Sequence, residues 1–185
     1  EVGAGASGAA AGMLAPAAEV TFQEEPLLQL GLRSMELYPD FVEELEQASG
    51  RDVDYRTEGT LVVGIDRDDT EELSRLHEFH QELGLDVSRL SGDDAREIEP
   101  ALAPRVHSAL HVPGDHQIDA YRMVEALGEA FEEAGGQLYE QTEVSRVDCD
   151  GRVHGVELAD GTEVTAPTVL LFADGSLSEP RGQQV

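Results

Sequence analysis

Four glycines near the start of the chain are spaced so that the backbone could lie directly against a ligand. Residues 1–16 read EVGAGASGAAAGMLAP, in which Gly3, Gly5, Gly8 and Gly12 lie among small residues. Backbone without bulky side chains can contact a cofactor closely, and a glycine-rich turn that enters a helix directs free N–H groups at an anion such as a phosphate. The segment therefore predicts close contact with a ligand.

The first three of these glycines also fit the G-x-G-x-x-G spacing of a dinucleotide-binding turn. That motif follows a buried strand and is completed by an acidic strand end about 20 residues later. Only Glu1 and Val2 precede Gly3, and the later position falls in FQEEPLLQL, which is typical of a helix start. A first dinucleotide-binding turn and a flexible small-residue segment are therefore alternatives to a third interpretation.

The third interpretation is a resemblance to a known family. The sequence ASGAAAGMLAP of Ala6–Pro16 resembles the second flavin-contacting segment of the D-amino-acid-oxidase-like flavoproteins, and its Ala-Gly-Met-Leu step resembles their glycine oxidase branch. Further resemblances are YRTEGTLVVGID, the IEPAL pattern and HVPGDHQIDAYRMVEAL. They extend from Gly5 to Gly175, and the family's first glycine-rich turn and its C-terminal half would lie outside this chain.

The resemblance implies FAD as the cofactor. It also implies oxidation of glycine or a related small amino acid or amine, with hydride transfer to the flavin and dioxygen (O2) as acceptor. In the glycine oxidase branch this reaction often supplies the imine precursor for thiamine biosynthesis. Sarcosine oxidases and D-amino-acid dehydrogenases share the scaffold and remain alternatives, as do a non-catalytic acidic binding module and a remnant that no longer retains flavin.

The resemblance also implies cofactor contacts at individual positions. It places Met13 near the flavin ring, at the edge of the substrate site, and Ser7 where its hydroxyl could bind a phosphate. Val144 matches the position whose backbone holds the adenine, although an ordinary core valine is the alternative. The full set of implied contacts is Ala6, Ser7, Ala11, Gly12, Met13, Val144, Ala173 and Gly175. No catalytic side chain is implied, because members of this class do not all use one.

Parts of the family's site have no counterpart in the sequence. Where the family has Ala-Ala-Gly-Ala-Trp-Ser, this chain has Ala173-Asp174-Gly175-Ser176-Leu177-Ser178, which introduces a carboxylate and loses the aromatic ring. The acidic residue that holds the ribose, and the arginine and tyrosine that clamp the substrate carboxylate, are also missing. An arginine fork is the natural grip on a carboxylate, so we expect this chain alone to bind an amino acid poorly.

The histidines and the cysteine give no pattern of a second catalytic site. His77 and His80 are three residues apart on an expected helix, and His107 and His111 could share one face of a strand. No cysteine pair or carboxylate–histidine motif accompanies them, so we expect no metal. Cys149 is expected to be a passive residue of a strand.

The charge of the chain is strongly negative. It has 39 acidic residues against 12 basic ones, all arginine, and a formal net charge of −27. This field disfavours nucleic acid and anionic membranes as partners, and no run approaches the ~18 apolar residues of a membrane span. Because the acids are spread along the chain, we favour adaptation to high salt over a dedicated acidic partner surface. One cysteine and no visible leader fit a cytoplasmic protein.

The order of elements predicts an α/β (α+β mixed) fold. We expect a partial FAD-binding Rossmann-like domain with an inserted piece of an antiparallel-sheet substrate domain. Residues 1–52 and 119–176 are the expected flavin-domain segments, residues 53–118 the substrate-domain segment and residues 177–185 an atypical tail. The loss of a central strand would leave open sheet edges, so self-association as a homo-oligomer is left open.

Periodicity and turn residues place the individual elements. Ser91 and Asp119 are expected helix N-caps, and Pro39 is expected to kink its helix or split it in two. Asp150-Gly151 and Asp160-Gly161 are expected hairpin turns. Helices are predicted over residues 27–48, 70–83, 92–99 and 120–134, and strands near residues 53–56, 60–65, 87–90, 106–112, 137–141, 144–149, 152–158, 163–165 and 168–172.

Overall fold

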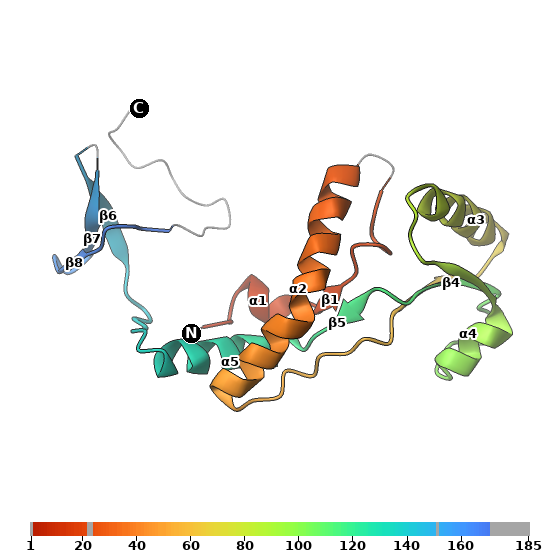
Figure 1. The fold of residues 1–185 in the computed structure, drawn as a ribbon, viewed down its shortest axis with the longest axis horizontal. Helices are drawn as coiled ribbons and strands as arrows, with labels where there is room; N and C mark the ends of the chain where they lie inside the picture. Colours follow the sequence, from red (N-terminus) through yellow and green to blue (C-terminus); the bar gives the residue numbers. More distant parts are fainter. Residues whose placement is uncertain (1, 22–23, 151, 171–185) are drawn as a thin grey trace. The chain divides into compact units, whose positions relative to one another are not determined.

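The computed structural model describes residues 2–21, 24–150 and 152–170. It divides into two compact units, Val2–Gln137 and the residues from Leu138 onward. Helices α1 to α5 and strands β1 to β5 belong to the first unit, and strands β6 to β8 to the second (Figure 1). Among the described residues, no helix is both long and apolar enough to cross a membrane.

The long helix α2, Glu25–Ser49, is defined by its two ends and by an apolar stripe. Pro26 lies in the first turn, where its missing N–H costs no helix bond, and Gly50 ends the helix with a left-handed φ of 70°. The helix runs unbroken through Pro39, so the predicted split does not occur. Of the apolar side chains of this helix, Leu28, Met35, Val42 and Leu45 are buried, whereas Leu27, Leu30, Leu37 and Phe41 are exposed.

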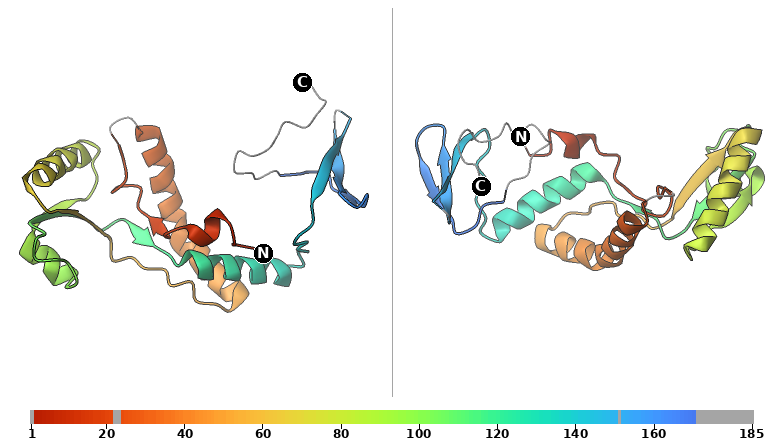
Figure 2. Two further views of the ribbon diagram at one scale, coloured as in Figure 1. Left: turned by 180° about the vertical axis from the view of Figure 1, so that it is seen from behind. Right: turned by 90° about the horizontal axis from the view of Figure 1, so that it is seen from above.

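An antiparallel sheet of three strands lies at one end of the first unit (Figure 1). Strand β4, Ser108–Val112, is the central strand, with β2, Thr60–Gly64, on one side and β3, Ser88–Ser91, on the other. Helices α3, Arg67–Glu82, and α4, Gly92–Ile98, lie on opposite sides of this sheet (Figures 1 and 2). This arrangement confirms the predicted antiparallel sheet, with bounds shifted by a few residues.

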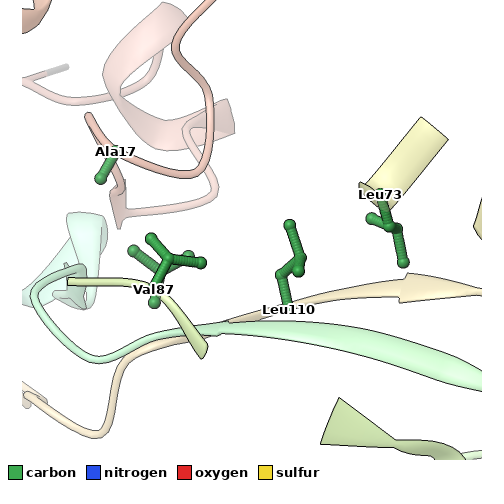
Figure 3. Packing of buried hydrophobic residues seen from close by; sticks show 5 residues of the cluster. Ala17, Leu73, Val87 and Leu110 are labelled. Atoms are coloured by element: carbon green, nitrogen blue, oxygen red, sulfur yellow. The ribbon is translucent and has the colours of Figure 1, made fainter. Parts of the chain in front are cut away.

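The core on the α3 side of this sheet also takes in the N-terminal segment. Figure 3 shows Leu73 of α3 above Leu110 of β4, with Val87 and Ala17 farther along the same cluster. Leu110 has an exposed fraction of 0%, and Ala17 one of 5%. The segment that follows the glycines is therefore anchored on the sheet by apolar packing.

Side-chain caps fix the starts of three helices. The prediction that Ser91 and Asp119 are N-caps is confirmed, since each accepts a hydrogen bond from backbone N–H groups of the helix that follows. Asp66 and Asp69 form a capping box at α3. Helix α3 therefore begins at Arg67, three residues before the predicted start.

Helix α5, Ala120–Glu133, packs against α2 through a second apolar cluster. Val53 is completely buried in this cluster. The prediction of a strand over residues 53–56 is wrong, because among these residues only Arg56 makes a β-bridge, to Gln117. Val53 is apolar because it fills the space between two helices, and not because it alternates along a sheet.

The second unit is a meander of three antiparallel strands. Strand β7, Val153–Leu158, pairs with β6, Val144–Cys149, and with β8, Glu163–Thr165, as predicted. The turn at Gly161 has a φ of 84°, which suits the predicted Asp-Gly hairpin. Gly151 of the other predicted hairpin lies outside the described residues.

Two predicted strands of this part of the chain are not formed by the described residues. Residues 137–141 and 168–170 have irregular or turn backbone, and residues 171–172 lie outside the described part. Tyr139 and Leu170 are exposed by 63% and 74%. Apolar residues give a strand only where a neighbouring strand can pair with them, and no described strand pairs with these two segments.

Candidate functional site

Three of the four N-terminal glycines, Gly3, Gly8 and Gly12, lie so close to other atoms that a Cβ would clash, whereas Gly5 does not. Gly3 has a φ of 76°, and a Cβ there would lie 2.9 Å from Cγ1 of Val124 on α5. A Cβ on Gly8 would lie 2.2 Å from the carbonyl oxygen of Gly3. These two glycines are therefore required by packing within the chain. The helix α1 between Ala6 and Ala9 has only four residues, which does not support the interpretation as a first dinucleotide-binding turn.

Gly12 is required by the close approach of two backbone segments. It has a φ of 76°, and a Cβ there would lie 1.9 Å from the carbonyl oxygen of Ile118. Its own carbonyl oxygen accepts a hydrogen bond of 2.9 Å from the N–H of Ile118. Directly after it, β1, Met13–Leu14, pairs with β5, His116–Gln117. Gly12 therefore lets the small-residue segment join β5 as a strand.

Gly5 differs from the other three glycines, because no other atom lies close to the position of its missing side chain. A Cβ built on Gly5 has no heavy atom within 4 Å. The implied contacts Ala6, Ser7 and Ala11 are exposed, and Met13 is 51% exposed. Next to them, Ala11, Ala120 and other residues line a hollow of about 310 Å³. Five implied cofactor contacts, Ala6, Ser7, Ala11, Gly12 and Met13, are close together in the sequence, and of these Ala11 lines the hollow.

These residues fit a large, flat cofactor. A surface of backbone and methyl groups lets an aromatic ring or a ribityl chain approach closely, and the open space at Gly5 leaves room for it. Ser7 adds one hydroxyl that can donate a hydrogen bond. The N-terminus of α5 is less suited to a phosphate, because the Asp119 carboxylate already accepts from the N–H groups of Tyr121 and Arg122.

The implied adenine contact lies in the second unit. Val144 is the first residue of β6, pairs with Leu158 and is 48% exposed. Its side chain is therefore not buried by the described residues. Ala173 and Gly175, with the neighbouring Asp174, lie outside the described residues.

The short sheet of β1 and β5 has two different faces. On the inner face, the Tyr55 hydroxyl lies 2.5 Å from Nδ1 of His116, and the Tyr55 ring stacks on Tyr38 at a centroid distance of 6.1 Å. Burial raises the pKa of both tyrosines above the usual value, so both remain protonated at neutral pH. Tyr38, Tyr55 and His116 therefore cover the inner face of the β1–β5 sheet, and the opposite face remains exposed.

A buried carboxylate that the sequence did not single out holds the end of the same segment. Asp115 is completely buried, and its two oxygens accept hydrogen bonds of 3.1 and 2.9 Å from the N–H groups of Ala17 and Ala18. Burial raises the pKa of Asp115, and the two N–H groups oppose that rise. The residues on either side of β1 are thus fixed, by Gly12 before it and by Asp115 after it.

The histidines do not form a metal site in the part of the chain that is described. No group of three or more histidine, cysteine, aspartate or glutamate side chains is arranged to hold a metal there. His80 is completely buried, and burial lowers its pKa. Asp93 binds Arg96 at 2.6 Å, and Asp94 caps the helix that Ser91 begins.

A sequence model described as FAD dependent oxidoreductase matches residues 1–183. The chain belongs to this family. It is 34% identical over 185 residues to the glycine oxidase of Geobacillus kaustophilus, covering 100% of this chain and 48% of that protein. It is 32% identical over 142 residues to the bifunctional protein ThiO/ThiG of Synechocystis sp., covering 77% of this chain and 20% of that protein.

Comparison with solved structures also matches the chain to glycine oxidases. The crystal structure of the Geobacillus kaustophilus glycine oxidase matches with a TM-score of 0.79 and 34% identity, over 89% of this chain and 44% of that one. The chain therefore spans about half the length of the glycine oxidase relative that it matches. The predicted family, the mixed α/β fold and FAD as the family's cofactor are confirmed.

Proposed function

We propose that this chain carries FAD-binding and substrate-domain segments of an enzyme that oxidises glycine or a related small amino acid or amine. In this proposal dioxygen is the acceptor, and the product imine serves thiamine biosynthesis. The proposal rests above all on the small-residue segment, which resembles the corresponding segment of the glycine oxidase branch and has open space at Gly5. The similarity to glycine oxidases along the whole chain supports it.

The residues of this segment would have separate roles. Ala6 and Ala11 would form the surface under the cofactor and exclude water from it, and the Ser7 hydroxyl would donate a hydrogen bond to a phosphate oxygen. Met13, held in β1, would lie between the cofactor and the substrate. When bound, the flavin would accept the hydride from the substrate carbon and pass electrons to dioxygen.

The remaining assignments belong to the same proposal. Residues 1–52 and 119–176 would be flavin-domain segments, and residues 53–118 a substrate-domain segment. Val144 would hold the adenine through its backbone, and Ala173 and Gly175 would contact the cofactor. Adaptation to high salt and a cytoplasmic location are also part of the proposal.

A substitution at Gly5 tests the cofactor surface directly. A Cβ on Gly5 would meet no heavy atom within 4 Å, so the side chain of Gly5→Leu clashes with no described atom. The φ of −89° and ψ of −137° lie outside the α and β regions that residues with a Cβ favour, so the fold of Gly5→Leu is checked by circular dichroism. We expect the parent chain, purified in molar salt with FAD, to show a two-band flavin absorption spectrum, and Gly5→Leu to bind FAD about tenfold or more weakly. Glycine, sarcosine and D-alanine are then tried as reductants of the bound flavin.

Gly128→Leu is the matched control. Gly128 lies within α5 and also has no heavy atom within 4 Å of a Cβ, so the same side chain is added outside residues 5–13. FAD binding by this control should equal that of the parent. A folded parent chain that stays colourless, or equal FAD affinities for all three proteins, would refute the proposed cofactor surface and favour a remnant or a non-catalytic module.

A further inference from the structure

Three exposed side chains lie in a row on the open face of the β1–β5 sheet. Gln117 pairs with Met13 on one side and with Arg56 on the other. The pair with Arg56 is held by two backbone hydrogen bonds, of 2.8 and 2.9 Å. Directly paired residues of antiparallel strands point to the same face. Met13, Gln117 and Arg56 therefore form one continuous surface, which we name the Arg56 ledge.

The ledge has dimensions that suit a small molecule. Neighbouring strands are about 4.8 Å apart, so the backbones at Met13 and Arg56 are separated by about 10 Å, with Gln117 between them. Arg56 and Gln117 also line a hollow of about 410 Å³. A small amino acid that lies over Gln117 would have Met13 at one end and the guanidinium at the other.

The guanidinium of Arg56 retains free hydrogen-bonding capacity. Its Nε donates to Oδ1 of Asp54 at 3.0 Å, and no other described residue accepts from its two terminal nitrogens. Arg51 is different, because its Nε, Nη1 and Nη2 all bind the carboxylates of Glu125 and Glu129. In a chain with a net charge of −27, an arginine with two free terminal nitrogens beside a hollow is a specific place for an added anion.

The hollow is also lined by two acidic side chains and by His111. Glu58 and Glu99 line it together with Arg56, and Leu61 and Leu102 add apolar surface. A ligand with both an anionic and a cationic end would satisfy this set better than a simple anion or a simple cation. An α-amino acid in its zwitterionic form has this charge pattern.

We propose that the Arg56 ledge binds the carboxylate of a small amino acid through the two terminal nitrogens of Arg56, beside Met13. This inference rests on the proposed function, in which such an amino acid is oxidised next to Met13. The arginine clamp of the family would come from outside this chain, whereas Arg56 lies within it. Arg56 would therefore be an additional residue that determines specificity for carboxylate-bearing substrates.

The test is a titration of the full chain, labelled with ¹⁵N, with three separate probes: glycine, acetate and ethylamine. Glycine should shift the side-chain signals of Arg56 and Gln117 most, acetate less, and ethylamine least. In Arg56→Gln, glycine should bind about tenfold more weakly, because a charge-assisted pair of hydrogen bonds is lost. The control is Arg67→Gln, since Arg67 is an exposed arginine paired with Glu71 on α3, outside the ledge.

The outcomes separate this inference from the proposed function. Absence of glycine-induced shifts in the parent chain, or equal glycine affinity in Arg56→Gln, would overturn the ledge. FAD binding is measured on the same three proteins and should be unaffected by either substitution. If FAD binds but glycine does not, the ledge fails alone; if glycine binds through Arg56 but FAD does not bind, the ledge stands and the proposed function fails.

Discussion

The two units of the chain are stabilised in different ways. In Val2–Gln137, residues such as Leu110, Val53 and Ala126 are completely buried in apolar clusters. In the described residues from Leu138 onward, Gly155 alone is buried, and Val144 is 48% exposed. A small sheet without a covered apolar face has little stability of its own. The first unit should therefore depend on packing, and the second on strand pairing and surface charge.

The largest effect should come from removing the centre of the first unit's core. Leu110→Ala takes away a completely buried side chain between α3 and the sheet, and should lower the free energy of unfolding by about 2–5 kcal/mol. Hydrogen exchange followed by mass spectrometry should show faster exchange in β2, β3 and β4. Exchange in β6 to β8 should be unchanged.

The control for this substitution is Leu30→Ala. Leu30 lies on α2 and is 67% exposed, so its replacement should change the free energy of unfolding by less than about 0.5 kcal/mol. If Leu110→Ala accelerates exchange in β6 to β8 as much as in β2 to β4, the two units unfold together. The proposed difference in how they are stabilised would then be wrong.

A smaller effect should come from the buried carboxylate that holds the N-terminal segment. In the acid range Asp115 is protonated, and its carboxyl group still has two oxygens that can accept. In Asp115→Asn a single amide oxygen replaces them, so one of the N–H groups of Ala17 and Ala18 loses its acceptor. The loss in free energy of unfolding should be about 1–3 kcal/mol in the acid range. Urea unfolding of both proteins measures it.

The pH dependence of this loss has a defined sign. Burial raises the folded-state pKa of Asp115 above its usual value of 3.8, so the folded protein binds the proton more tightly than the unfolded chain. The stability from this group is fully present below pH 3.8 and is lost as the pH rises through the folded-state pKa. The advantage of the parent over Asp115→Asn should therefore shrink with rising pH, and an advantage that grows would contradict burial as the dominant cause.

The sequence predicted the elements whose signals are local. Two such signals are the N-caps Ser91 and Asp119, and a third is the set of three strands that forms the meander, because each can be read from neighbouring residues. The predicted strand over residues 53–56 failed because Val53 is buried by helices from other parts of the chain. Strand formation depends on a partner, and the sequence does not show which partner is present.

In the candidate site too, features with a local sequence signal were predicted, and features that depend on contacts between distant residues were not. The small-residue segment was found from its composition and its resemblance to a family. Asp115 was missed because it binds residues 97 and 98 positions away in the sequence. Arg56 was missed because only the pairing of Arg56, Gln117 and Met13 brings three distant segments together.

The smallest effects should come from two exposed arginines, one in each unit. Arg146 donates to Glu157 across the β6–β7 pair at 2.7 and 3.0 Å, and Arg51 joins α2 to α5 through Glu125 and Glu129. At low salt, Arg146→Gln should accelerate exchange in β6 and β7 more than Arg51→Gln does in α5, because the meander has no apolar cluster to compensate. Hydrogen exchange of the full chain measures both.

Salt should remove this difference and test the adaptation to high salt. At about 1 M salt, charges are screened beyond about 3 Å, so exposed ion pairs contribute little. Both variants should then exchange like the parent, while the parent itself becomes more stable, because repulsion within a net charge of −27 is screened. A parent equally stable in dilute buffer would reject salt adaptation. An Arg146→Gln defect that persists in molar salt would show that hydrogen-bond geometry, and not net charge, holds the meander together.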